Sequence, residues 1–223
     1  MEHSITIIHV DLIPDQGREL EALEWLDSDE HERCERFQSL VARRRYMLCR
    51  AALRAAICLQ LGCSNEALAF KLNEHGKPFA LVGGCVLFES FNVSHSGDHG
   101  LIALASRGCL GVDVEERAPR RNLGALIDGV CSAREQAELK SLDDRQRLHA
   151  FFRLWTIKEA LVKAHGRGLA MQVAELEVPE AMRRGAAKGI GRFAQMPETS
   201  WHLEDIGTDE FAAAVAYQAT SQS

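Results

Sequence analysis

With 223 residues, of which 46% are hydrophobic and 26% charged, the chain is long enough for one large domain or two small ones with a substantial core. Its net charge of -6 argues against general nucleic-acid binding, and we expect neither a signal sequence nor a membrane span, because no basic segment precedes an apolar run and no apolar run reaches about 18 residues. The seven cysteines form no Cys-x-x-Cys pair, so we expect free thiols in a cytoplasmic protein rather than zinc knuckles or disulfides.

The first half of the chain mixes short strands with helices. For the second of its helices Asp27 or Ser28 is the candidate cap, and for the third Ser39 caps the start and Gly62 stops the end. The segment 91–97 is predicted to run from an apolar strand into a polar turn that ends at glycine. The remaining predicted elements are helices at 19–26, 29–37 and 40–61, and strands at 5–12, 67–72, 85–89 and 100–105.

The second half repeats this alternation. Ser132 and Glu135 form the pattern of a capping box at the start of a helix near Ala133, and Gly166 ends the strongest helix of the chain. The sequence therefore predicts an α+β fold of two similar α/β subdomains, residues 1–107 and 108–223, in a pseudo-twofold arrangement with a cleft between them. The predicted elements of this half are helices from 133 and at 151–165, and strands at 110–115, 176–178, 191–195, 201–205 and 212–217.

Asp113 and Glu115 lie two residues apart in the run Gly-Val-Asp-Val-Glu. On a strand this spacing puts both carboxylates on one face. An Asp-x-Glu pair is more often simply a solvated face, but the apolar neighbours Leu110, Val112 and Val114 indicate that the opposite face is buried. The pair therefore points to a face where a cleft could lie.

Trp155, Glu159 and Lys163 recur at every fourth residue and share one stripe of the predicted helix. A Glu–Lys pair at this spacing commonly decorates an exposed helix, but a tryptophan on the same stripe indicates partial burial. If this helix packs on the strand at 110–115, three carboxylates converge beside a lysine. Such a group suits a hard divalent cation that also binds a phosphate.

Other polar segments have weaker interpretations. A hydroxyl and an imidazole at Ser94 and His95 suit phosphate recognition, and the alternative is a polar turn with ordinary hydrogen bonds. Lys77 lies at the tip of a Gly-Lys-Pro turn, where lysines are usually solvated. No Gly-x-Ser-x-Gly elbow, Walker A segment or Gly-x-Gly-x-x-Gly motif occurs, so a serine hydrolase, P-loop or Rossmann site is not supported.

Taken in order, the segments GKP, FNVSHSG, GVDVE and FFRLWTIKEALVKAHGRGL resemble the Sfp-type 4'-phosphopantetheinyl transferases over residues 29–169. The resemblance implies the 4'-phosphopantetheinyl transferase fold, with coenzyme A and Mg²⁺ at the junction of two subdomains. It also implies transfer of the phosphopantetheine arm of coenzyme A to a serine of an apo acyl or peptidyl carrier protein. The second product would be adenosine 3',5'-bisphosphate.

The resemblance also assigns expected roles to single residues. Where the family often has a lysine three residues before Arg33, this chain has Glu30, so one basic contact is in doubt. By position, the metal-binding acids are Asp113, Glu115 and Glu159; the lysine on the diphosphate is Lys163; contacts to the nucleotide end are Lys77, Ser94 and His95, the last to the 3'-phosphate; and Arg33 and Tyr46 fall where the family contacts phosphate or adenine.

The general base has two candidates. Glu159 can accept the serine proton directly or through water, and Glu135 occupies a position also proposed for that role in relatives. The alternative for Glu135 is the capping-box role, so we expect Glu159→Gln to abolish turnover and Glu135→Gln to slow it at most. The segment 117–134 is our expected carrier-docking surface, with Arg120 and Arg121 as its test residues.

Two other classes of function stay open from the sequence. One is a noncatalytic coenzyme A-binding module, although the presence of Asp113, Glu115, Glu159 and Lys163 argues against it. The other is a different Mg²⁺-dependent nucleotide phosphotransferase, which would act without a carrier. The two-half layout favours a monomer, and the sequence does not identify the carrier pathway.

Overall fold

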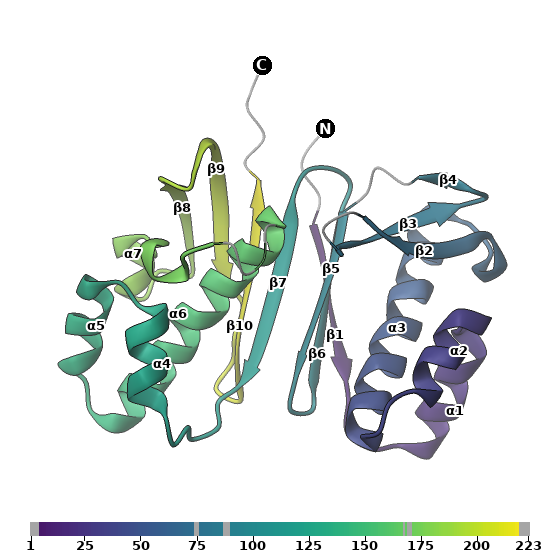
Figure 1. Ribbon diagram of the computed structural model, residues 1–223, viewed down its shortest axis with the longest axis horizontal. Helices are drawn as coiled ribbons and strands as arrows, with labels where there is room; N and C mark the ends of the chain where they lie inside the picture. Colours follow the sequence, from purple (N-terminus) through teal and green to yellow (C-terminus); the bar gives the residue numbers. More distant parts are fainter. Residues whose placement is uncertain (1–4, 74–75, 87–89, 167, 169–170, 219–223) are drawn as a thin grey trace.

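Helices and strands alternate in each half of the chain, and the two halves lie side by side (Figure 1). The computed structural model describes residues 5–73, 76–86, 90–166, 168 and 171–218. Three antiparallel sheets and the helices packed on them confirm the predicted mixed α+β class. Among the described helices, none combines the length and the apolar character that crossing a membrane requires.

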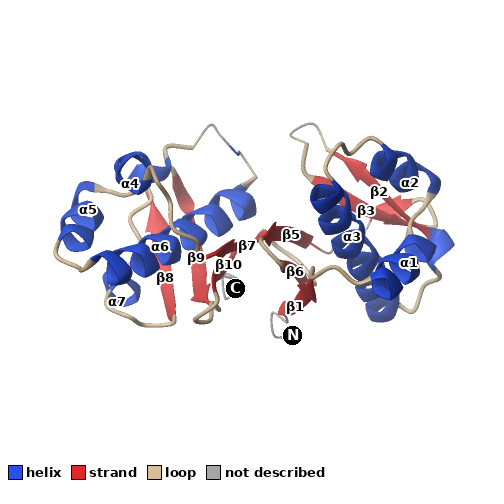
Figure 2. Ribbon diagram, turned by 90° about the horizontal axis from the view of Figure 1, so that it is seen from below, coloured by secondary structure: helices blue, strands red, loops and turns tan. Residues whose placement is uncertain are grey.

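The first half is built on a three-stranded sheet in the order β1-β6-β5, with α3 packed on β6 and β1. A smaller sheet, β2-β3-β4, lies beyond the carboxyl end of α3. Seen from below, α1, α2 and α3 gather on one side of the larger sheet (Figure 2). The elements are β1 (Ile5–Asp11), α1 (Gln16–Trp25), α2 (Ser28–Glu35), α3 (Leu40–Leu61), β2 (Leu68–Leu72), β3 (Pro78–Val82), β4 (Cys85–Val86), β5 (Ser90–Ser96) and β6 (His99–Ala105).

The second half is built on a four-stranded antiparallel sheet in the order β7-β10-β9-β8. The long helix α6 packs across β7, β10 and β9, and the shorter helices lie outside it (Figure 2). The elements are β7 (Leu110–Glu116), α4 (Leu123–Val130), α5 (Ala133–Lys140), α6 (Asp144–His165), α7 (Glu180–Arg183), β8 (Lys188–Phe193), β9 (Met196–Asp205) and β10 (Phe211–Gln218).

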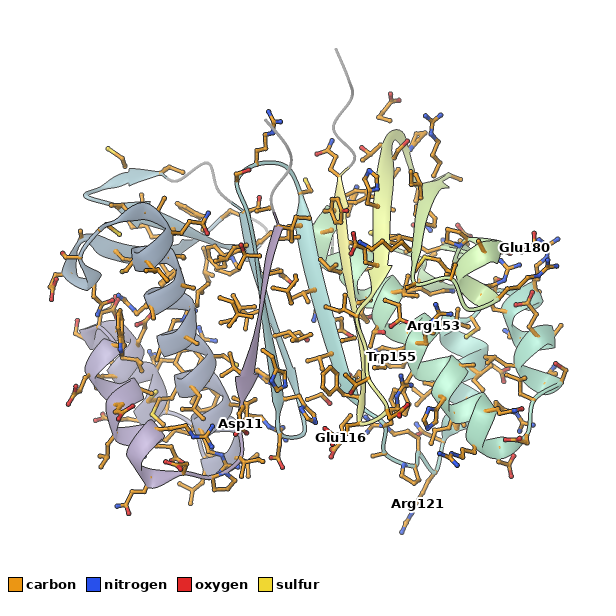
Figure 3. All side chains as sticks on the ribbon, turned by 180° about the vertical axis from the view of Figure 1, so that it is seen from behind. Asp11, Glu116, Arg121, Arg153, Trp155 and Glu180 are labelled. Carbon is orange, nitrogen blue, oxygen red and sulfur yellow. The ribbon has the colours of Figure 1, made fainter. Side chains whose placement is uncertain are left out.

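The two halves share a hydrophobic cluster between their sheets. Side chains at alternate positions of β6, β7 and β10 meet there, because alternate residues of a strand face the same side. Figure 3 shows side chains filling the space between the two sheets. The buried members are Leu101, Ala103, Ala105, Leu110, Val112, Val114, Phe211, Ala213 and Val215.

The predicted helix ends are confirmed. Ser39 caps α3 by accepting from the main-chain N–H of Ala42, and Gly62 ends it with a φ of 65°. Gly166 ends α6 with a φ of 85°, a conformation that glycine adopts without steric cost. Ser132 and Glu135 form the predicted capping box of α5.

Several segments differ from the sequence prediction. Residues 91–96, expected to enter a polar turn, belong to strand β5, because their main chain pairs with β6. The strand predicted at 176–178 was wrong: Leu176 and Val178 are buried in the core, but the segment joins no sheet. Helices α4 and α7 and strand β3 were missed, and residues 87–89 of the strand predicted at 85–89 lie outside the described residues.

Candidate functional site

A glycine on β7 allows helix α6 to lie directly on this strand. A Cβ atom at Gly111 would lie 2.1 Å from the carbonyl oxygen of Ala160 and 2.4 Å from the nitrogen of Ala164. No side chain larger than hydrogen fits in that space. The close crossing brings the Nζ of Lys163 to 2.6 Å from Asp113 of β7, and it brings Glu159 close enough for electrostatic repulsion from Asp113 and Glu115.

Asp113 is the most buried of the three acids. Its Oδ1 accepts from the Oγ of Ser94 at 2.8 Å and from the Nζ of Lys163 at 2.6 Å. Its Oδ2 is buried and has no hydrogen-bond partner in the described structure. Burial raises the pKa of Asp113 above its usual range, although the contacts with Lys163 and Ser94 oppose the shift.

Glu115 lies two residues further along β7, on the same face. Its Oε2 accepts from the Oγ of Ser96 at 2.9 Å and from Arg120 at 3.4 Å. Burial raises the pKa of Glu115, the hydrogen bond from Ser96 opposes the shift, and the nearby Asp113 adds to it. Glu115 is therefore a carboxylate whose charged form is not fully compensated.

Glu159 completes the acidic group from the helix side. Burial raises its pKa, and repulsion from Asp113 and Glu115 adds to the shift. Trp155, one turn earlier on the same stripe, is half-buried as predicted and packs edge-on against Phe151. The stripe is therefore not an ordinary solvated helix face.

A divalent cation fits these residues chemically. Within the residues that the structure describes, no three His, Cys, Asp or Glu side chains stand close enough together to form a finished metal site. The buried Oδ2 of Asp113, however, lacks a partner, and each of the three acids is destabilised in its charged form. Carboxylate oxygens are the preferred ligands of Mg²⁺, and a cation would compensate both features.

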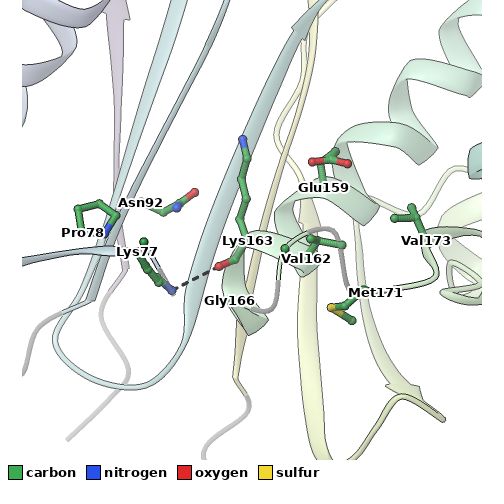
Figure 4. Close-up of a pocket in the computed structure, with 11 residues that line it drawn as sticks. Lys77, Pro78, Asn92, Glu159, Val162, Lys163, Gly166, Met171 and Val173 are labelled. Atoms are coloured by element: carbon green, nitrogen blue, oxygen red, sulfur yellow. Dashed lines mark hydrogen bonds between the residues drawn. The ribbon is translucent and has the colours of Figure 1, made fainter. Parts of the chain in front are cut away.

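A pocket of about 370 Å³ opens beside Glu159 and Lys163 and is also lined by Lys77 and Asn92 (Figure 4). The Nζ of Lys77 donates to the carbonyl oxygens of Lys163 at 3.3 Å and Leu110 at 3.5 Å. Burial lowers the pKa of Lys77. Lys77 thus connects the first half of the chain to the second, and among the described residues its ammonium donates to carbonyl oxygens and to no carboxylate.

A second pocket, of about 230 Å³, adjoins the first and shares Pro78 and Asn92 with it. Its wall includes the predicted residues Arg33, Tyr46 and His95. The guanidinium of Arg33 lies 4.8 Å from the centre of the Tyr46 ring, a cation–π contact. Burial lowers the pKa of His95, and the charges of Arg45 and Lys163 lower it further.

Arg50 was missed by sequence reasoning, although it lines the second pocket. Its guanidinium lies 5.6 Å from the centre of the Tyr46 ring and 4.4 Å from that of Phe70. Glu30, the acid in place of an expected lysine, is buried, caps α2 and pairs with Arg50 and Arg54. Arg50 therefore supplies to the second pocket a positive charge that Glu30 cannot supply. The fold, and not the local sequence, brings Arg50 to this pocket.

Glu135 lies away from this site, in the core of the second half. Its Oε2 accepts from the Nζ of Lys158 at 2.6 Å and from the nitrogen of Ser132 at 2.8 Å. Its Oε1 accepts from the nitrogen of Val178 at 2.9 Å. These contacts favour the capping role over proton transfer.

The two arginines of the expected docking segment differ in their contacts. Arg120 pairs with Glu115 and lies 5.5 Å from the centre of the Phe152 ring, so a change there would also disturb the acidic group. Arg121 is exposed and projects from the surface (Figure 3). Only Arg121 is a clean test of docking.

Comparison with known proteins identifies the family of the chain. A model of the 4'-phosphopantetheinyl transferase superfamily matches residues 109–216, and a model of the 4'-phosphopantetheinyl transferase N-terminal region matches residues 13–107. The boundary between the two matches falls at the connection between β6 and β7.

Single relatives agree with these models. A putative 4'-phosphopantetheinyl transferase of Synechocystis is 37% identical over 65% of this chain and 58% of its own length. The 4'-phosphopantetheinyl transferases HetI of Nostoc (36% identity) and AcpT of Salmonella typhimurium (41%) match over 69% and 49% of this chain and over 64% and 56% of their own lengths. The chain thus spans somewhat more than half the length of these relatives, and it belongs to the 4'-phosphopantetheinyl transferase superfamily.

Proposed function

We propose that the chain is an Sfp-type 4'-phosphopantetheinyl transferase that moves the 4'-phosphopantetheine arm of coenzyme A to a serine of an apo acyl or peptidyl carrier protein. The observation that carries this proposal is the group of Asp113, Glu115, Glu159 and Lys163. Its members Glu159 and Lys163 line the first of two adjoining pockets, and the second pocket has basic and aromatic walls. A diphosphate with a nucleotide at one end needs this combination of charge and stacking surface.

In the proposed reaction the carrier serine oxygen attacks the phosphorus that bears the pantetheine arm. A new serine–phosphate bond forms, the bond between the two phosphates breaks, and adenosine 3',5'-bisphosphate leaves with the electron pair. Glu159 accepts the serine proton, directly or through water. Lys163 faces the charge that develops on the leaving phosphate.

Asp113, Glu115 and Glu159 would hold the Mg²⁺ ion. When bound, Mg²⁺ neutralises the diphosphate and stabilises the negative charge of the departing group. Asp113 offers a ligand atom for this ion, because its buried Oδ2 has no hydrogen-bond partner among the described residues.

Coenzyme A would extend from the first pocket into the second. Lys77 and Lys163 lie at the diphosphate end of this path, and His95, Arg33 and Tyr46 lie at the nucleotide end. The stacked pair of Arg33 and Tyr46 offers both a positive charge for a phosphate and a flat surface for adenine. Ser94, expected to contact the nucleotide end, already donates its hydroxyl hydrogen to Asp113.

Further proposals concern the whole chain. We propose that residues 1–107 and 108–223 are two subdomains with the active site at their junction, and that one chain works as a monomer because the second half supplies the partner surface. All seven cysteines are free thiols, which agrees with a cytoplasmic location.

The test is intact mass spectrometry of an apo carrier protein incubated with this chain, coenzyme A and Mg²⁺. A gain of one phosphopantetheine that is lost with EDTA, and with Asp113→Ala, supports the reaction and its metal dependence. Arg121→Glu serves as the docking probe, and Arg184→Glu, which reverses an exposed charge outside the segment 117–134, serves as its control.

The outcome also separates the two other classes of function. Absence of modification of several unrelated apo carriers, with coenzyme A still bound, would favour a noncatalytic coenzyme A-binding module. Release of adenosine 3',5'-bisphosphate without any carrier would favour another nucleotide phosphotransferase. An unchanged carrier KM in Arg121→Glu would contradict docking at 117–134.

A further inference from the structure

Strand β5 carries four polar side chains on the face that meets the second half of the chain. They occupy alternate positions, so they share one face, while Phe91 and Val93 point into the core of the first half. We call these four residues the β5 ladder: Ser90, Asn92, Ser94 and Ser96.

The β5 ladder joins two strands that form no main-chain pair. β5 is an edge of one sheet and β7 is an edge of another. Side-chain oxygens of the ladder accept from main-chain N–H groups of β7 in the place where a neighbouring strand would offer carbonyl oxygens. The contacts are Asn92 to Val112 at 2.9 Å, Ser94 to Val114 at 3.4 Å and Ser96 to Glu116 at 3.1 Å, and Ser90 donates to the carbonyl of Gly108.

Two rungs of the ladder also hold the acidic side chains. A serine hydroxyl has one hydrogen to donate. Ser94 donates it to Asp113 and accepts from the main-chain N–H of Val114, the residue after Asp113. Ser96 repeats this pattern: it donates to Glu115 and accepts from the main-chain N–H of Glu116. Each serine therefore holds one carboxylate of β7 next to the main-chain N–H of the residue that follows that carboxylate.

The result is a pair of carboxylates that are each anchored by one oxygen. The bonds from Ser94 and Lys163 go to Oδ1 of Asp113, and those from Ser96 and Arg120 go to Oε2 of Glu115. At Asp113 the other oxygen, Oδ2, has no hydrogen-bond partner in the part of the chain that the structure describes. Hydrogen bonds that orient ligating carboxylates are worth about 10–100-fold in metal affinity or activity.

We propose that Ser96 and Ser94 are positioning residues, which fix Glu115 and Asp113 with one oxygen turned toward the cation. This inference rests on the proposed function and extends it from the acids to the two hydroxyls that hydrogen-bond to them. Ser96 is the sharper test, because Ser94 also contacts Lys163.

The experiment titrates the protein with Mn²⁺ and follows the electron paramagnetic resonance signal of the free ion. Ser96→Ala removes the hydroxyl and is expected to weaken Mn²⁺ binding about 10-fold, whereas Ser96→Thr keeps it and is expected to stay within about 2-fold of the wild type. Ser90→Ala is the matched control, since it removes a ladder serine that reaches Gly108 and no carboxylate. In the carrier assay, Ser96→Ala should raise the KM for Mg²⁺ more than it lowers kcat.

Urea unfolding of each variant shows whether a loss of Mn²⁺ binding reflects a loss of the folded state. If Ser96→Ala does not fold, Ser96→Cys replaces it, because a thiol of similar shape is a weaker donor. Equal Mn²⁺ affinity in wild type and Ser96→Ala would overturn the proposal, and so would equal losses in the Ala and Thr variants or an absence of Mn²⁺ binding by the wild type.

The two proposals fail separately. A wild type that modifies carriers while Ser96→Ala binds Mn²⁺ equally well would overturn the positioning role alone. A wild type that modifies no carrier, but loses Mn²⁺ affinity in Ser96→Ala and regains it in Ser96→Thr, would support the positioning role and overturn the transferase.

Discussion

Helix α6 carries two lysines that each contact a buried carboxylate, and the two ion pairs differ in how their atoms are used. Lys158 donates to Glu135 and to two main-chain carbonyls, and both oxygens of Glu135 accept further bonds. Their side chains are 1% and 0% exposed. The polar atoms of this pair all have partners, and neither side chain lines either pocket. The pair connects α5, α6 and the segment after α6 in the core.

Lys163 and Asp113 form the other pair, with side chains 29% and 6% exposed. Here Oδ2 of Asp113 has no hydrogen-bond partner within the described ranges, two more acids lie nearby, and Lys163 lines a pocket. Burial without full compensation costs stability, and proteins retain it mainly where function needs it. The comparison teaches that burial of a charge does not mark a site, whereas an unsatisfied charge beside a pocket does.

The largest expected effect on activity comes from the unsatisfied group. Glu159→Gln should lower kcat/KM by about 10²–10⁴-fold, because the side chain can no longer accept a proton. Glu135→Gln should keep most of the activity of each folded molecule, since Glu135 is committed to Lys158 and the cap of α5. Steady-state kinetics on both variants, corrected for the folded fraction, measures the two losses of kcat/KM. Equal losses would contradict the different roles of Glu159 and Glu135.

The largest expected effect on stability comes from the satisfied pair. Lys158→Met leaves the Glu135 carboxylate buried without its cation, which should lower the free energy of unfolding by about 3–5 kcal/mol. Urea denaturation measures it. The double variant Lys158→Met with Glu135→Leu removes both charges and should recover much of the loss. A double variant as unstable as the single one would show that the charges are not the cause.

Sequence reasoning reached the acids of the site because their spacing is local. The i,i+2 spacing of Asp113 and Glu115 and the helical spacing of Glu159 and Lys163 put each pair on one face, and the fold brings the faces together. The capping box, with the caps at Ser39 and Gly62, was equally predictable, because caps depend on a few neighbouring residues.

What the sequence did not reveal depends on contacts between distant segments. Arg50 reads as one of many helix arginines, and only the fold brings it to Tyr46 and Phe70. The alternation of Ser94 and Ser96 was visible, but its meaning required β7 as a neighbour. The apolar residues at 176–178 suggested a strand because burial alone does not distinguish a strand from a buried irregular segment.

A substitution at the crossing of β7 and α6 should have a smaller effect, and this effect should fall on stability and activity together. Gly111→Ala places a methyl group against the main chain of Ala160 and Ala164, so it should cost about 1–3 kcal/mol and move Glu159 away from Asp113. Urea denaturation and carrier modification should therefore fall together. Gly124→Ala on α4 is the control, because nothing lies within 4 Å of its added Cβ, and it should leave both quantities unchanged or raise stability slightly. Full activity in Gly111→Ala would contradict the role of this crossing.

The smallest expected effect is a dependence on pH. The pKa of Glu159 is raised in the folded state by burial and by Asp113. Between the ordinary and the raised pKa the folded state therefore binds more protons than the unfolded state, and this side chain lowers stability as the pH rises through that window. Glu159→Gln removes the dependence, so its stability relative to the wild type should be greater at pH 7.5 than at pH 5 without metal.

Glu204 provides the control of opposite sign. Partial burial opposes the shift, but hydrogen bonds from Lys188 and Tyr217 lower its pKa, so the stability that it contributes is present above the ordinary pKa and is lost as the pH falls. Glu204→Gln should therefore be less stable than the wild type at pH 7.5, and the deficit should shrink in acid. Urea unfolding at both pH values measures the two variants together. Since Mg²⁺ compensates the acids around Asp113, it should abolish the stability advantage of Glu159→Gln and leave the stability deficit of Glu204→Gln unchanged. If the stabilities of the two variants relative to the wild type changed in parallel with pH, the distinction between unsatisfied and satisfied carboxylates would be contradicted.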